Sequence, residues 1–172
     1  PVVARESYSP EHRLDKALPL SSDREHMGLV GDMEFHSPER FFIITANVRR
    51  DRYYSTYDGQ ANMFNPLPPK PTYHHFTNMH TAVKITPHRL LSLRCNYGDN
   101  WRVPSFYELF GDRGGVVAKP GLRPEHAYRW DAGIRLLFPE HIEYAAGRFD
   151  VVYFNTSYRN LIQWYANNYG FI

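Results

Sequence analysis

Hydrophobic and polar residues alternate along several stretches of the chain, a pattern that predicts β-strands with one apolar and one polar face. The clearest alternation is at 127–136, where apolar side chains fill every second position from Tyr128 to Leu136. The same pattern predicts strands over 26–35, 41–52 and 89–97, and a weaker one over 73–86 and 147–158. No comparable stretch has a helical period. The sequence therefore predicts an all-β, antiparallel protein of about six or seven strands.

The predicted connections between these strands are of two kinds. Short turns are predicted at 37–40, 86–89 and around 138–141. Long polar loops rich in Gly, Pro, Asn, Asp and Tyr are predicted at about 9–24, 54–72 and 98–126. Short turns at one end of the strands and long loops at the other are typical of a transmembrane β-barrel with periplasmic turns and extracellular loops.

Composition agrees with two-faced strands. Aromatic residues make up 16% of the chain, yet its mean hydropathy is −0.55. The net charge of +2 gives no footprint for binding nucleic acid. A single cysteine, Cys95, excludes an internal disulfide and any multi-cysteine metal site. It falls on the apolar face beside Leu93, where an inert thiol is expected.

Charged residues occupy the polar face at or near the middle of the predicted strands: Arg49, Asp51, Arg94, Arg129, Asp131 and Arg135. In a barrel they would line a wet interior, whereas in a soluble β-sandwich the same face would simply be solvated. Aromatic residues near strand ends would form the outer interfacial girdle of a barrel: Tyr53, Tyr54, Tyr73, Tyr97, Trp101 and Tyr128. The alternation alone does not choose between barrel and sandwich.

Five short motifs carry a family resemblance. The segment 100–111, N-W-R-V-P-S-F-Y-E-L-F-G, resembles the F-R-x-P-S-x-x-E-L-Y stretch of TonB-dependent receptors, with Trp101 in the Phe place and Phe110 in the Tyr place. The segment 119–125, K-P-G-L-R-P-E, resembles the N-P-x-L-K-P-E stretch that follows in that family, although Lys119 replaces the usual Asn.

Three further motifs appear in the family's order. Residues 131–133, D-A-G, resemble its x-E-x-G, with Asp in place of Glu. Residues 49–53, R-R-D-R-Y, resemble V-R-x-D-x-Y, and 158–163, Y-R-N-L-I-Q, resemble D-x-x-N-L-I. The ordered set spans roughly 45–163 and is far more specific than any one motif. The residues it marks as structural are Arg49, Asp51, Arg102, Pro104, Ser105, Glu108, Leu109, Leu122, Pro124, Glu125 and Gly133.

The resemblance implies that residues 1–172 are part of the C-terminal half of a twenty-two-stranded barrel wall, without the family's plug domain. It implies a place in the bacterial outer membrane, in contact with its lipid. The implied activity is TonB-coupled uptake of a scarce nutrient such as a ferric siderophore, haem or cobalamin. The TonB energy-transducing complex would act through the plug, and no cofactor, metal or catalytic residue is implied. Ligand-contact candidates are the loop aromatics Tyr57, Phe64, Tyr73, Phe106 and Tyr107.

Elementary chemistry suggests what the motif residues do. Pro104 and Pro124 cannot donate to a strand ladder, so each marks a strand end. Ser105 is expected to cap a short helical turn, with Glu108 as its capping-box partner. Arg102, Glu108 and Glu125 are expected to pair with one another or with the plug across the barrel interior, and such structural pairing is favoured over contact with a ligand.

Other functions stay open at this stage. A metal site among His74, His75 and His80 is disfavoured, because His75 faces the opposite side and the other two lie roughly 20 Å apart along a strand. No arrangement of residues indicates an enzyme. The alternatives are a passive porin-like or adhesin wall and a soluble antiparallel β-sandwich that binds a ligand.

Overall fold

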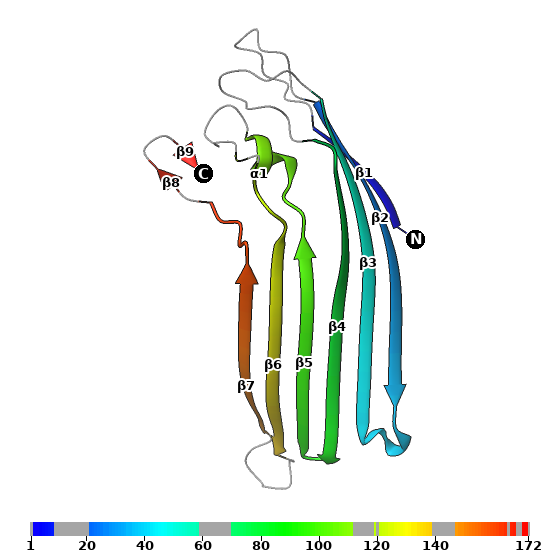
Figure 1. Cartoon of the computed structure of the whole chain (residues 1–172). Coiled ribbons are helices and arrows are strands. Elements are labelled where there is room, and N and C mark those ends of the chain that lie inside the picture. The colour runs from blue at the N-terminus through cyan, green and yellow to red at the C-terminus, as the bar shows by residue number, and fades with distance from the viewer. Residues whose placement is uncertain are drawn as a thin grey trace.

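The structure, a computed structural model, describes residues 2–8, 21–58, 70–111, 119, 121–138, 147–164, 166–167 and 170–171. Seven strands form one sheet in which spatial order follows chain order (Figure 1). They are β1 (Val2–Tyr8), β2 (Ser21–His36), β3 (Phe42–Asp58), β4 (Thr72–His88), β5 (Leu91–Arg102), β6 (Glu125–Phe138) and β7 (Gly147–Arg159). Two short strands, β8 (Ala166–Asn167) and β9 (Gly170–Phe171), pair with each other.

Every neighbouring pair in the large sheet is antiparallel, so the chain runs up and down between adjacent strands. This arrangement confirms the predicted antiparallel all-β fold and all six predicted strands. The seventh strand, β1, pairs along its whole length with the first part of β2, from Val2 opposite Gly28 to Tyr8 opposite Ser22.

The strands are longer than the alternation predicts, which corrects the bounds of the three predicted loops. Residues 21–24, 54–58, 98–102 and 125–126 were expected in loops but belong to strands. Their side chains are mostly polar or aromatic, so they look like loop residues. Backbone hydrogen bonding to a neighbouring strand does not depend on side-chain polarity, and the ladder therefore continues through them.

Two of the predicted short turns lie within the described residues. A single 3₁₀ turn, η1 (Pro38–Arg40), joins β2 to β3, with Glu39 at a φ of 60°. The Ser37 hydroxyl accepts a hydrogen bond from the Phe42 amide at 2.8 Å and closes this turn. Between β4 and β5 the turn falls at 89–90, slightly later than predicted, because β4 continues past an irregularity between Ile85 and His88. The turn predicted around 138–141 lies largely outside the described residues.

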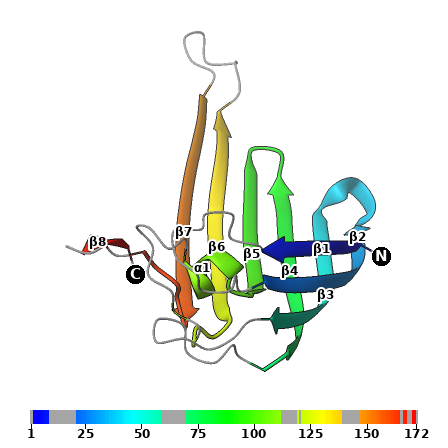
Figure 2. The same ribbon diagram turned by 90° about the horizontal axis from the view of Figure 1, so that it is seen from above.

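The sheet is curved and twisted, as the view from above shows (Figure 2). Its edge strands β1 and β7 do not pair with each other, so it forms an open section of wall. The right-handed twist of each strand rotates it relative to its neighbours and curves the sheet. When enough strands are present, a sheet curved in this way can close into a barrel. Among the residues that the structure describes, no helix is long and apolar enough to cross a membrane.

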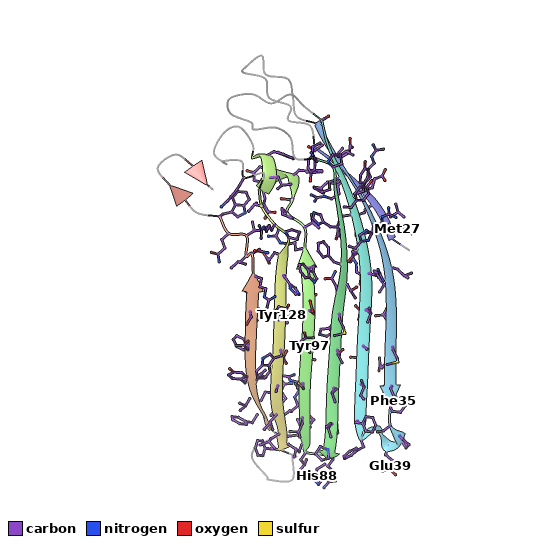
Figure 3. The ribbon with its side chains drawn as sticks, viewed as in Figure 1. Met27, Phe35, Glu39, His88, Tyr97 and Tyr128 are labelled. Atoms are coloured by element: carbon purple, nitrogen blue, oxygen red, sulfur yellow. The ribbon has the colours of Figure 1, made fainter. Side chains whose placement is uncertain are left out.

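Large apolar side chains are exposed along the sheet. On β2, Met27 lies toward the loop-bearing end and Phe35 near the end that bears the short turns (Figure 3). On β2, Met27, Leu29, Met33 and Phe35 are 54%, 65%, 61% and 51% exposed. On β6, Ile134 is 49% exposed. A soluble protein of this size would bury such a face. Exposure of this kind is what a lipid-facing barrel surface requires.

The described buried hydrophobic residues gather at one end of the sheet instead of between two layers. They are Phe106, Leu109 and Phe110, all from the short helix α1 (Phe106–Phe110) that follows β5. Tyr57 from β3 and Leu122 pack against this cluster. The sheet has no second layer over either face among the described strands, which excludes a β-sandwich for this part of the chain.

A charge placed on the apolar face tests its contact with lipid. Ile134→Lys in the full-length protein should destabilise folding into a bilayer by about 2–4 kcal/mol, because an ammonium group near the middle of the membrane loses its hydration. The measurement is urea-dependent folding into lipid vesicles, followed by gel mobility without heating. Arg129→Lys, a change on the polar face, is the matched control and should fold like the parent. Equal stability of Ile134→Lys and the parent would contradict a lipid-facing role.

Candidate functional site at the loop-bearing end of the strands

The centre of the site is Arg102, the last residue of β5, which lies between two carboxylates. Its Nη1 donates to both oxygens of Glu108 at 3.0 Å, and its Nη2 donates to Glu125 Oε2 at 3.2 Å. This geometry confirms the predicted pairing of the three residues.

Glu108 also builds the helix that follows. The Ser105 amide donates to Glu108 Oε2 at 2.7 Å, and the Glu108 amide donates back to the Ser105 hydroxyl at 3.3 Å. These reciprocal bonds form the predicted capping box, which stabilises a helix of only five residues. Glu108 is 9% exposed, so its carboxylate depends on these partners in place of water. One buried carboxylate thus connects a strand end to a helix start.

Glu125 connects the same centre to the end of the next strand. Its Oε2 accepts a hydrogen bond from the Ile162 amide at 3.1 Å. The Asn160 side chain donates to the Pro124 carbonyl at 3.3 Å, and Asn160 has a φ of 54°, in the left-handed region that Asn tolerates. Three motifs that are far apart in sequence therefore meet. We call this set, Arg102, Ser105, Glu108, Glu125, Asn160 and Ile162, the rim network.

A residue that sequence reasoning missed, Arg24 of β2, reaches the rim network across the sheet. Its Nη2 donates to the Pro104 carbonyl at 2.8 Å, and its guanidinium carbon lies 4.5 Å from the centre of the Phe106 ring. Nε donates to Ser55 at 3.0 Å and Nη1 lies 3.3 Å from Glu6. Arg24 fell inside the predicted 9–24 loop, and no sequence signal distinguished it.

A second polar cluster surrounds Asp51, whose side chain is only 1% exposed. Asp51 Oδ1 lies 2.6 Å from His26 Nε2 and accepts from Arg49 Nε at 2.7 Å. Its Oδ2 accepts from the Asn78 amide group at 2.8 Å. Gly28 lies opposite Asp51, and an added Cβ there would be 2.9 Å from Oδ1, so this position has room only for glycine. The Arg49–Asp51 pair explains the charged residues of the R-R-D-R-Y motif.

The two clusters are linked through Asn78, whose side-chain oxygen accepts from the Trp101 amide at 2.6 Å. Aromatic rings follow the same path across the strands. Tyr53 stacks on His26 with centroids 4.3 Å apart, and Trp101 stacks on Phe76 at 5.0 Å and on His126 at 3.7 Å. A recess of about 240 Å³ opens beside Arg24, His26, Tyr53, Trp101 and Arg102.

These contacts correct the predicted girdle at two positions. Tyr53 alternates with Asp51 and stacks on His26, so it lies on the polar face and not on the outer surface. Trp101 lies beside the same recess. The reason differs in the two cases. Tyr53 follows the strict period of two, whereas the register of β5 with β4 ends at Asp99, and beyond that point Trp101 stacks on Phe76. Tyr54 and Tyr73, by contrast, stack on each other at 4.5 Å.

The predicted ligand-contact residues are in different surroundings. Tyr57 and Tyr73 belong to strands β3 and β4 and not to a loop. Phe106 is 1% exposed and packs within the α1 cluster, whereas Tyr107 is 43% and Tyr73 58% exposed. Phe64 lies outside the described residues. No group of three or more His, Cys, Asp or Glu side chains within the described part of the chain is placed to hold a metal ion.

The predicted structural residues occupy defined places. Leu109 is in the α1 cluster, Leu122 packs on it, and Pro104 and Pro124 flank β5 and β6 as expected. Gly133 is buried on β6 directly opposite Arg94.

A family model described as "TonB dependent receptor-like, beta-barrel" matches residues 21–172. The chain belongs to the TonB-dependent receptor β-barrel family. This match covers all five motifs and the strands β2 to β7 that carry them. No curated protein and no solved structure matches the chain significantly. The family is one of bacterial outer-membrane receptors and transporters, so the curved open sheet is a section of receptor wall.

Removing the Glu108 carboxylate should release the segment after β5. In Glu108→Ala, both hydrogen bonds from Arg102 and the Glu108 half of the capping box are lost together, and each net hydrogen bond contributes about 1 kcal/mol. We expect faster proteolysis within 103–124 in the folded receptor, measured by mass spectrometry of the fragments. Glu108→Gln retains a side chain suited to the capping box and should be intermediate. Glu25→Ala, which removes an exposed carboxylate of β2, is the control and should leave the cleavage rate unchanged. A cleavage rate in Glu108→Ala equal to that of the parent would contradict the anchoring role.

The Asp51 cluster should contribute to stability of the wall. Asp51→Asn removes the charge that Arg49 and His26 share while keeping the shape of the side chain. We expect a loss of about 1–3 kcal/mol in the free energy of unfolding, because a charge-assisted, buried hydrogen-bond set is broken. Asp32→Asn is the matched control, since Asp32 is an exposed residue of β2 that accepts from Asn47. The free energy of unfolding is measured by urea titration in micelles. Similar losses of this free energy in both variants would show that the buried position of Asp51 adds nothing to stability.

Proposed function

We propose that this chain forms part of the wall of a TonB-coupled importer that takes up a scarce, bulky nutrient such as a ferric siderophore, haem or cobalamin. The observation that carries the proposal is the rim network, in which family-motif residues from β5, α1 and the ends of β6 and β7 bind one another directly. An energy-transducing complex of the TonB type is the partner implied by this function.

The rim network supports this proposal because it anchors a long connection to the strand ends. The first part of this connection, residues 103–111, is held by the Arg102–Glu108 pair and by Arg24 through Pro104. An anchored segment of this kind can present side chains to a ligand without large loss of conformational entropy on binding. Tyr107, which is exposed and lies 5.6 Å from Trp164 between ring centres, is the best placed of the predicted contact residues.

The recess beside Trp101 adds a second surface for a ligand. It combines aromatic rings with guanidinium groups, a combination that suits large planar or anionic ligands. Phe106 is best assigned to packing, because its ring is buried against Tyr57, Phe110 and Arg24. In this proposal ligand contact therefore falls to Tyr107 and to the recess, while Phe106 supports α1.

A passive porin-like wall is the alternative, and energy dependence separates the two. A strain lacking the chromosomal receptor is supplied with the parent receptor and grown on a panel of single iron, haem or cobalamin sources. Uptake of one radiolabelled source should be restored and should stop when the TonB gene is deleted or a protonophore is added. Uptake that continues at the same rate under both conditions would establish passive diffusion and overturn the proposal.

A further inference from the structure

Two arginines of the R-R-D-R-Y segment lie on the apolar face of the sheet. Successive residues of a strand point to opposite faces, and β3 pairs with β2 and with β4 without any shift of register. The apolar side chains at every second position from Phe42 to Val48 therefore share one face, and Arg50 and Arg52 follow them on that face. Both arginines are exposed. Charged residues on a face that otherwise meets lipid are costly, so their position indicates a function.

The register places these two arginines at the loop-bearing edge of the apolar band. From Phe42 to Val48 the apolar positions of β3 extend over roughly 20 Å. Arg50 and Arg52 come next, and they lie opposite Leu29 and Met27, two apolar residues of β2. The end of a barrel that carries the long loops is its extracellular end. The two guanidinium groups therefore lie where the acyl chains of the outer leaflet meet its headgroups.

The neighbouring strands supply little negative charge to these arginines. Neither Arg50 nor Arg52 makes a hydrogen bond or an ion pair within the described part of the chain. The residues of β2 and β4 that lie opposite or diagonal to Arg50 include no acid. For Arg52 the one acid at such a position is Glu25, which has Arg5 directly opposite it on β1. Both guanidinium groups thus keep N–H donors for an anion from outside the chain.

A hollow of about 480 Å³ lies beside Arg52 on the same face. Val3 and Met27, which the register places level with Arg52, give the hollow apolar side chains. Nearer the loops it is lined by the rings of Tyr54 and Tyr73, which stack with their centroids 4.5 Å apart. Along the strands, apolar side chains, guanidinium groups and tyrosine rings follow in this order. A membrane lipid presents acyl chains, phosphate and polar headgroup in the same order.

We propose that Arg50 and Arg52 form a binding site for a phosphate-bearing lipid headgroup of the outer leaflet. Anionic membrane lipids carry phosphate groups, and a guanidinium group binds phosphate through two parallel N–H bonds. The two arginines are roughly 7 Å apart along the strand, so they can bind one phosphate jointly or two phosphates of one lipid. The acyl chains then lie against Met27 and Leu29, a contact that a free phosphate ion lacks. The site does not depend on which nutrient the receptor imports.

The test measures lipid binding by native mass spectrometry of the full-length receptor in detergent micelles. The probes are lipid A with two phosphate groups and inorganic phosphate. The parent is compared with the double variants Arg50→Gln/Arg52→Gln and Arg94→Gln/Arg129→Gln. The second double variant is the matched control, because it removes the same charge from the polar face of β5 and β6. Gel mobility without heating shows beforehand that each variant is folded.

We expect the parent and the control variant to bind lipid A equally. Arg50→Gln/Arg52→Gln should bind it about tenfold more weakly or worse, because two cations that face the lipid phosphates are lost. Inorganic phosphate at the same concentration as lipid A should not displace the lipid. If the variant Arg50→Gln/Arg52→Gln does not fold, the single variants Arg50→Gln and Arg52→Gln provide the same comparison, each with a smaller loss of affinity.

Several outcomes would overturn the proposal. Failure of the parent to bind lipid A would do so, as would equal affinity in the parent and in Arg50→Gln/Arg52→Gln. Equal weakening in the control variant would show that lipid A responds only to the total charge of the receptor. Displacement by inorganic phosphate would assign the site to the free ion instead of a lipid. None of these results bears on energy-dependent nutrient uptake, which is measured separately.

Discussion

The cross-strand register is the constraint on which every other feature of this wall depends. Each strand of the antiparallel sheet obtains its backbone hydrogen bonds from its two neighbours, and each pairing fixes which side chains face one another. A slip of one residue would carry Asp51 to the apolar face and Ile44 to the polar face. The alternation of the sequence therefore excludes registers shifted by an odd number of residues, because these would place charges against lipid.

The rim network shows how a wall with few buried hydrophobic side chains can still fix the residues that follow β5 and those that begin β6. Only the α1 cluster supplies a conventional hydrophobic core among the described residues. At the ends of the strands, carboxylates that accept from several donors hold the chain. Glu108 accepts hydrogen bonds from Arg102 and Ser105, and Glu125 accepts from Arg102 and Ile162. Each carboxylate has more than one partner, so the loss of either carboxylate leaves several donors unsatisfied.

Charge on the polar face has two distinct consequences in this molecule. Around Asp51, two cationic or potentially cationic groups and an amide satisfy one buried carboxylate, which favours stability. On β4 and β5, Lys84 lies directly opposite Arg94, and like charges at opposed positions destabilise a strand pair. Glycine enables both arrangements, since Gly28 and Gly133 leave room for a charged side chain from the neighbouring strand.

The sequence by itself determined the strands, their two faces, the family motifs and the local chemistry of the capping box, because each depends on residues that are close together in the chain or on a period of two. Only the tertiary structure decided that Arg24 reaches Pro104, that Asn78 joins Asp51 to Trp101, and that Trp101 stacks on Phe76 and His126. It also decided that β2, β3, β5 and β6 extend into the predicted loops. These features follow from which strand lies beside which and in what register, and residues 20 to 80 positions apart carry no local signal of their meeting.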